Sequence, residues 1–221
     1  MDLAQPLSSL IPTLDADVLT VLARSEQPLT GRRIAALARR GTHPAIQKIL
    51  DRLVAHGVVH AQPAGPARLY RLNRAHLLAA PILAAVTVRE TLLNRFREAI
   101  DSWPVPCVHA SLFGSFTRGE AGPESDIDVL VIRPNDVADD DATWNQQLID
   151  LERQIALWSG NTLSWFDTTE GSLTRALAGD GPEGEEPIIT SWRKDALHLS
   201  GEPLAHLLAR LQQRSSPAGS R

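Results

Sequence analysis

VHASLFGSFTRGEAGPESDIDVLVI, residues 108–132, decides the fold of the larger part of this chain. An apolar run at residues 108–113 ends in a Gly-Ser pair, and a second run at residues 126–132 follows a polar segment. This order is typical of a strand, a turn with a short helix, and another strand. Because side chains alternate along a strand, we expect Asp126 and Asp128 on one side of the sheet.

These residues form a candidate phosphate and metal site. The carboxylates of Asp126 and Asp128 repel one another, so without a cation the pKa of at least one should rise. Mg²⁺ is commonly held by one or two carboxylates together with substrate phosphate oxygens. Gly114 allows close approach of a phosphate, Ser115 offers a hydroxyl and an amide donor, and Arg118 adds a permanent positive charge. The set predicts metal-dependent phosphoryl or nucleotidyl transfer.

The segment resembles the nucleotidyltransferase superfamily related to DNA polymerase beta, most closely its minimal nucleotidyltransferase and antibiotic adenylyltransferase branches. The pattern is an apolar residue, Gly, Ser or Gly, a spacer, then Asp, an apolar residue and Asp, and here the spacer is residues 116–125. The resemblance extends over about residues 90–200 and implies an α+β fold, with a mixed β-sheet flanked by helices. It also implies ATP or another nucleoside triphosphate as substrate, with Ser115 and Arg118 on the outer phosphates and one or two Mg²⁺ ions.

The same resemblance implies a third carboxylate on a neighbouring strand. We expect that strand at residues 162–167, which makes Asp167 the candidate, although Glu170 lies close by and stays open as an alternative. In this assignment Asp126, Asp128 and Asp167 are the metal ligands and the catalytic acids. Asp167 would position or deprotonate the attacking hydroxyl.

The rest of this half is less informative. Asp139, Asp140 and Asp141 are expected to cap the next helix rather than to bind metal. We further expect a polar loop at 179–187, helices at 192–198 and 203–211, and a disordered tail at 213–221.

The first part of the chain has the pattern of a small helical domain with a hairpin. Apolar residues recur at helical spacing from residue 14 to residue 22, Thr30 and Thr42 can cap two further helices, and two β-prone runs follow at 58–62 and 68–72. This order resembles the winged helix-turn-helix of bacterial transcription regulators, over about residues 13–75. The resemblance implies DNA binding with the third helix in the major groove.

Five polar residues are the candidate DNA contacts. They lie on the third helix or beside the tip of the hairpin, and the alternative for each is an ordinary solvated side chain. The five are His43, Gln47, Lys48, Arg52 and Arg68.

Charge is divided unequally between the two parts. Residues 1–80 hold ten Lys and Arg against five Asp and Glu, a net charge of +5, and the rest holds twelve against 21, a net charge of −9. A basic domain favours polyanions such as nucleic acid.

Between the two parts, residues 76–101 have a helical apolar stripe, which is either interdomain packing or the seam of a homodimer. The nucleotidyltransferase domain is expected at 102–212.

Several classes are excluded by composition. The longest apolar run, residues 77–88, is shorter than the roughly 20 residues of a membrane helix, and Pro81 interrupts it. The single cysteine, Cys107, predicts neither a disulfide nor a zinc site. Residues 1–20 lack the continuous apolar core of a secretory signal, so we expect a cytoplasmic protein with no membrane partner.

Two functions from different classes remain open. The first is an enzyme that transfers a nucleoside monophosphate to an acceptor, which the sequence does not identify among small molecules, proteins and RNA ends. The second is a transcription regulator whose transferase fold senses a nucleotide or a partner without turnover. An antitoxin role that modifies a partner protein is a third reading.

Overall fold

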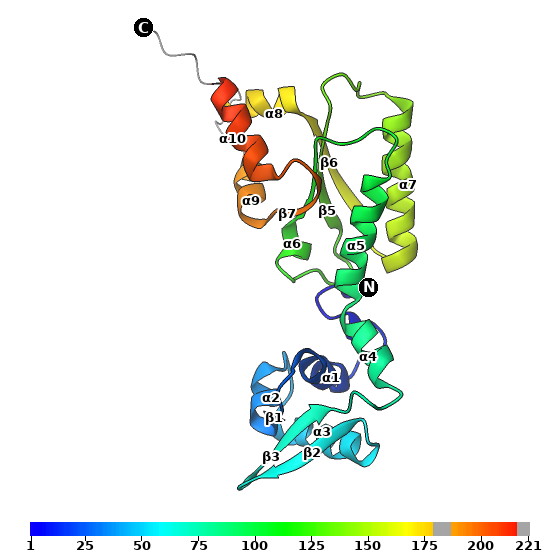
Figure 1. Cartoon of the computed structure of the whole chain (residues 1–221), viewed down its shortest axis with the longest axis vertical. Coiled ribbons are helices and arrows are strands. Elements are labelled where there is room, and N and C mark those ends of the chain that lie inside the picture. Colours follow the sequence, from blue (N-terminus) through cyan, green and yellow to red (C-terminus); the bar gives the residue numbers. More distant parts are fainter. Residues whose placement is uncertain (179–186, 216–221) are drawn as a thin grey trace. The chain divides into compact units, whose positions relative to one another are not determined.

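The computed structural model describes residues 1–178 and 187–215 (Figure 1). The chain divides into two compact units. The N-terminal unit contains residues 4–90 and Asp2, and the C-terminal unit begins at Thr91 and includes Met1 and Leu3. Most of the loop predicted at 179–187 and residues 216–221 of the predicted tail lie outside the described residues.

The N-terminal unit has three packed helices followed by an antiparallel hairpin. Its elements are η1 (Pro6–Ser9), α1 (Leu14–Arg24), β1 (Leu29–Thr30), α2 (Gly31–Leu37), α3 (His43–Ala55), β2 (Val59–Ala64), β3 (Ala67–Leu72) and α4 (Ala79–Val86). The strands form an antiparallel sheet in the order β1-β3-β2. The predicted caps are present, because the Thr30 side chain accepts a hydrogen bond from the amide of Arg33 and the Thr42 side chain accepts one from the amide of Ala45.

The C-terminal unit is a mixed sheet with helices on both faces. Its elements are α5 (Val88–Asp101, which begins before the unit boundary), β4 (His109–Phe113), α6 (Gly114–Thr117), β5 (Ile127–Arg133), α7 (Ala142–Ser159), β6 (Leu163–Thr169), α8 (Glu170–Leu177), α9 (Pro187–Asp195), β7 (Leu197–Gly201) and α10 (Leu204–Ser215). The strand order is β6-β5-β4-β7; β5 and β6 are parallel and the other pairs are antiparallel. An α+β architecture with a mixed sheet is therefore confirmed.

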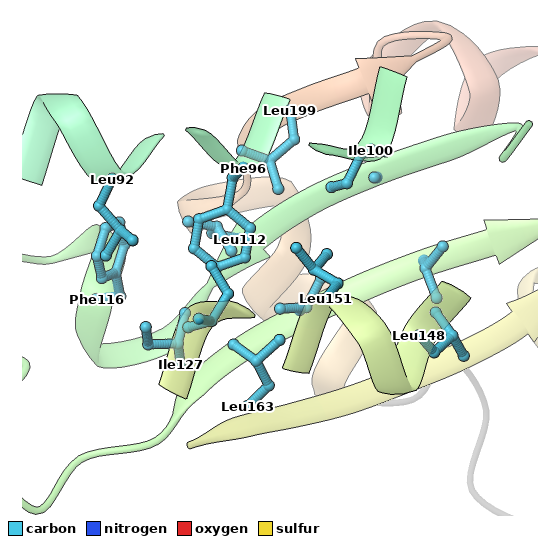
Figure 2. Packing of buried hydrophobic residues seen from close by; sticks show 14 of the residues in the cluster. Leu92, Phe96, Ile100, Leu112, Phe116, Ile127, Leu148, Leu151, Leu163 and Leu199 are labelled. Atoms are coloured by element: carbon cyan, nitrogen blue, oxygen red, sulfur yellow. The ribbon is translucent and has the colours of Figure 1, made fainter. Parts of the chain in front are cut away.

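Strand β5 is the centre of this unit, and its side chains alternate between two layers of helices. Ile127, Val129 and Val131 face α5 and α7, where Phe96 and Leu151 belong to the same core (Figure 2). We call this side the α5/α7 face. Every one of these five side chains is buried, and complete burial of such a side chain contributes about 1.5–3 kcal/mol. The near-continuous apolar sequence of β5 follows from its burial on both faces.

The opposite side of the sheet is covered by the last three helices, and we call it the α8–α10 face. Leu130 and Ile132 of β5 pack there with Leu173 of α8, Trp192 of α9 and Leu207 of α10. In Figure 1 these helices lie across the sheet from α5 and α7. By strand alternation, Asp128 belongs to this face.

Two predictions about the end of the chain were wrong. A helix was expected at 192–198, but α9 ends at Asp195 and residues 197–201 form the edge strand β7, paired with β4. The tail was expected from residue 213, but α10 continues to Ser215. The short strand β7 depends on β4, which completes its hydrogen bonds and is distant in sequence, so the local pattern did not predict it.

The stripe predicted at 76–101 forms two helices, α4 and α5.

No helix within residues 1–178 or 187–215 has both the length and the hydrophobicity needed to cross a bilayer.

Candidate active site and nucleic-acid interface

The bend after β4 lies directly against the carboxylate of Asp128. Gly114 has φ +72°, a left-handed conformation that glycine adopts without strain. A Cβ atom on this residue would lie 2.2 Å from Oδ2 of Asp128, closer than any nonbonded contact allows. Only glycine therefore lets the bend and the carboxylate occupy these positions together.

Asp128 is a carboxylate in an environment that disfavours its charge. Burial is the largest cause that raises its pKa, the negative charge of Asp126 raises it further, and the positive charge of Arg118 opposes both. Asp126 itself is exposed just before β5, and the hydroxyl of Thr162 donates a hydrogen bond to its Oδ1. The predicted pair is therefore brought together, with an excess of negative charge.

Two further predicted residues flank the same bend. Ser115 lies in α6, and its carbonyl oxygen accepts a hydrogen bond of 2.9 Å from the amide of Glu120. Arg118 follows α6, and its guanidinium donates from Nε to Glu120 at 2.9 Å and from Nη1 to Asp195 at 3.1 Å. The partner Asp195 was not foreseen. It is 77 residues away in the sequence, and no local pattern connects it to the bend.

Asp167 is not brought to this site, which corrects the predicted third acid. In the β5–β6 register Asp128 lies opposite Ser164, whereas Asp167 lies opposite Val131. Asp167 is therefore on the α5/α7 face. There its Oδ2 accepts hydrogen bonds from Arg133 Nη1 at 2.7 Å and from Trp144 Nε1 at 3.0 Å.

Glu170, the alternative third acid, is also engaged elsewhere. It begins α8, and its carboxylate pairs with Arg210 of α10. Arg210 also pairs with Glu202 at 2.6 Å, so these three residues link α8, the end of β7 and α10. This cluster stabilises the packing of α10.

The residues present fit a metal held jointly with substrate rather than one held by the protein alone. Within residues 1–178 and 187–215, no three or more His, Cys, Asp or Glu side chains are grouped so as to hold a metal ion. A pair of carboxylates, one with a raised pKa, matches the one or two acidic ligands that Mg²⁺ typically takes when phosphate oxygens supply others. Asp126 and Asp128 are the two groups available for this role.

The predicted DNA contacts occupy two different sides of helix α3. A hollow beside α3 and β3 is lined by His43, Gln47 and Arg68, among others. The Gln47 amide donates to the Tyr70 hydroxyl at 2.9 Å and to Asp51 at 3.0 Å, which holds it against the hairpin.

The basic candidates differ in their exposure and in their partners. Arg68 pairs with Asp51 at 3.3 Å, and Lys48 is exposed. Arg52 is turned away from the hollow, because its guanidinium pairs with Asp15 of α1. The five candidates therefore do not form one continuous surface.

Comparison with known proteins identifies the chemistry of the C-terminal unit. Residues 93–162 match the family model described as "Nucleotidyltransferase domain", a range that includes Gly114, Asp126 and Asp128 and ends before Asp167. The chain thus carries a transferase domain of a class that transfers nucleoside monophosphates. No curated protein matches the chain. A solved structure described as "Crystal structure of the toxin-antitoxin with AMP-PNP" is similar over 55% of this chain and 85% of that chain, with 18% identity and a TM-score of 0.37.

Proposed function

We propose that this protein transfers a nucleoside monophosphate from a nucleoside triphosphate, with ATP as the first candidate, to a hydroxyl group of an acceptor. The observation that carries the proposal is the contact between Gly114 and Asp128. It places a carboxylate with a raised pKa directly at a glycine bend, next to a second carboxylate. An acidic pair whose charge Arg118 offsets only in part is costly unless a further cation binds there.

Asp126 and Asp128 would hold Mg²⁺ at this site. When bound, the metal would neutralise the pair and stabilise the negative charge that develops on the transferred phosphoryl group. The hydroxyl of Thr162 orients Asp126 by hydrogen bonding, and Asp128 is half-buried beside the bend. Arg118 and the amide and hydroxyl of Ser115 would contact the outer phosphates.

The reaction is an in-line displacement at the α-phosphorus. A bond forms between the acceptor oxygen and phosphorus as the bond from phosphorus to the α–β bridging oxygen breaks. Pyrophosphate leaves with that electron pair, and the acceptor proton passes to solvent. The chain's own contribution is positioning and electrostatic stabilisation, because phosphoryl transfer requires little covalent chemistry from the protein.

Label transfer from α-³²P nucleoside triphosphates tests this function. The purified protein is incubated with each of the four triphosphates and Mg²⁺, together with candidate aminoglycosides, RNA or a lysate. We expect labelled product with the wild type and none with Asp126→Asn/Asp128→Asn. Asp150→Asn, an exposed carboxylate of α7 that undergoes the same chemical change, is the matched control and should retain transfer. Equal labelling by the wild type and the double variant would refute the proposal.

Nucleotide sensing without turnover is the second candidate, and the placement of Asp167 favours it. The residue expected to activate the acceptor is bound to Arg133 on the α5/α7 face. A sensor would bind Mg²⁺ and a nucleoside triphosphate but transfer no label to any acceptor. Calorimetric binding with an inactive label-transfer assay would select this function over the enzyme.

For the N-terminal unit we propose a winged helix-turn-helix over residues 13–75 that binds DNA. Its support is the order of three helices and a hairpin, with α3 capped by Thr42. The hollow beside α3 is lined by three groups that suit nucleic acid, Arg32, His43 and Arg68. Residues 76–101 would connect this domain to the nucleotidyltransferase domain at 102–212.

A mobility-shift assay over a salt series tests DNA binding, with the DNA upstream of the gene as probe. Each lost phosphate contact should lower the slope of log affinity against log salt by about 1. We expect this change for Lys48→Ala. Arg52→Ala should change the slope less, because Arg52 pairs with Asp15. A complex that is insensitive to salt, or no complex at all, would contradict the proposal.

A further inference from the structure

Arg118 is held at the candidate site by two carboxylates of different character. Glu120 accepts from Nε, and its side chain is 60% exposed. Asp195 accepts from Nη1, and its side chain is only 13% exposed. An exposed ion pair is weakened by water and salt, whereas a largely buried carboxylate holds its partner in one place. Asp195 is therefore the partner that determines where the guanidinium lies.

The position of Asp195 in its helix is unfavourable without this pairing. It is the last residue of α9, where the partial negative charge of a helix end disfavours a carboxylate. The positive charge of Arg118 offsets that cost.

Packing of helix α9 against the sheet fixes the position of Asp195. Trp192, one turn earlier in α9, packs edge-to-face on Phe113 with ring centroids 6.0 Å apart and on Phe166 at 4.7 Å. Phe113 directly precedes Gly114 and lies opposite Asp128 in the β4–β5 ladder. The same helix therefore contacts the strand that leads into the bend and the arginine that follows it.

The pairing leaves most of the guanidinium available. Arginine has five N–H groups, and the bonds to Glu120 and Asp195 use one at Nε and one at Nη1. The remaining N–H groups include both on Nη2, which can donate to phosphate oxygens in the fork geometry that arginine favours. Asp195 thus need not be displaced when a polyphosphate binds.

We propose that Asp195 is a positioning residue that holds Arg118 toward the outer phosphates of the bound nucleotide. This inference rests on the proposed function of the same site. In this role Asp195 acts through the guanidinium and not by contact with the substrate. Its loss should therefore weaken polyphosphate binding more than it slows the chemical step.

Asp195→Asn tests the inference, with Mg²⁺–tripolyphosphate as a probe that has outer phosphates but no base. We expect calorimetry to give a dissociation constant about five- to tenfold higher than that of the wild type, as for the replacement of one charged hydrogen bond by a neutral one. KM for the nucleoside triphosphate should rise by a similar factor, and kcat should change less. Asp195→Glu should restore part of the affinity. Glu120→Gln, which changes the exposed partner of the same arginine, should have a smaller effect than Asp195→Asn.

A double-mutant cycle separates positioning from a general structural effect. In the Arg118→Ala background, Asp195→Asn should produce no further loss of tripolyphosphate affinity. An equal loss in both backgrounds, or an unchanged dissociation constant in the single variant, would overturn the inference. If the wild type binds tripolyphosphate but transfers no label, the transferase proposal fails and the binding comparison still decides the role of Asp195. If the wild type transfers label but does not bind tripolyphosphate, the inference about Asp195 fails and the transferase proposal stands.

Discussion

Acidification should destabilise the C-terminal unit through His109, a completely buried histidine of β4 (0% exposed). Its Nδ1 lies 2.8 Å from the carbonyl oxygen of Glu202, and its Nε2 lies 2.9 Å from Oγ of Ser111. A carbonyl only accepts, so Nδ1 carries the hydrogen and Nε2 of the neutral ring accepts from the serine hydroxyl. Burial lowers the pKa of His109 from 6.5 to about 4, the nearby His198 adds to this effect, and the bond to Glu202 opposes it.

The sign and size of the effect follow from this difference in pKa. The unfolded chain takes up the proton as pH falls through 6.5, whereas the folded protein does so only near pH 4. Stability is therefore fully present above pH 6.5 and is lost progressively toward pH 4. At ~1.36 kcal/mol for each factor of ten in proton affinity, the complete loss is about 3 kcal/mol. Between pH 7 and pH 4.5 it is about 2 kcal/mol.

Urea unfolding followed by tryptophan fluorescence measures this loss in the right part of the chain. The five tryptophans, Trp103, Trp144, Trp158, Trp165 and Trp192, all belong to the C-terminal unit. His109→Asn removes the titrating ring but keeps a donor for Glu202, and other acidic groups titrate equally in both proteins. We therefore expect the variant to lose about 2 kcal/mol less than the wild type between pH 7 and pH 4.5.

Parallel stability curves for the two proteins would refute this reasoning. They would mean that the folded protein accepts the proton as readily as the unfolded chain does. An NMR signal assigned to His109 that titrates near pH 6.5 in the folded protein would lead to the same conclusion.

Three further predictions concern the candidate site. Gly114→Ala should reduce label transfer at least about 100-fold, because the added Cβ displaces Asp128. The control is Gly119→Ala, at φ +70° with nothing within 4 Å of a Cβ, which should show only the backbone strain of about 1–2 kcal/mol in urea unfolding. Equal label transfer by both variants would contradict the role of the contact. Asp167→Asn should lower the free energy of unfolding by about 1–3 kcal/mol by weakening the pair with Arg133, and kcat should be nearly unchanged. A kcat reduced about 100-fold would show that Asp167 takes part in catalysis. Thr162→Val should reduce label transfer about three- to tenfold by freeing Asp126, and a rate equal to that of the wild type would show that this hydrogen bond does not orient the carboxylate.

Features that depend on neighbours in sequence were predicted correctly. Thr30, Thr42 and Asp141 each cap a helix, because a cap bonds to an amide only three residues further along the chain. The strand, bend and strand at 108–132 were also predicted, since Asp128 and Phe113 are partners in an antiparallel pair joined by a short connection. Local geometry sufficed in these cases.

The third acid depended on a register that the sequence does not specify. A shift of one residue between β5 and β6 would place Asp167 on the other face of the sheet. The observed register instead pairs it with Val131, and it bonds to Arg133 and Trp144.

By itself, the sequence determined the acidic pair, the glycine bend and the apolar strand that joins them, because period-two alternation and a short connection constrain those positions. Only the tertiary structure decided which distant groups meet them. It brought the carboxylate of Asp195 to Arg118 and directed Asp167 away from the site. It also added β7 to the sheet beside β4. These outcomes depend on packing and strand pairing between segments far apart in the chain, where burial and hydrogen bonding over the whole unit outweigh local preference.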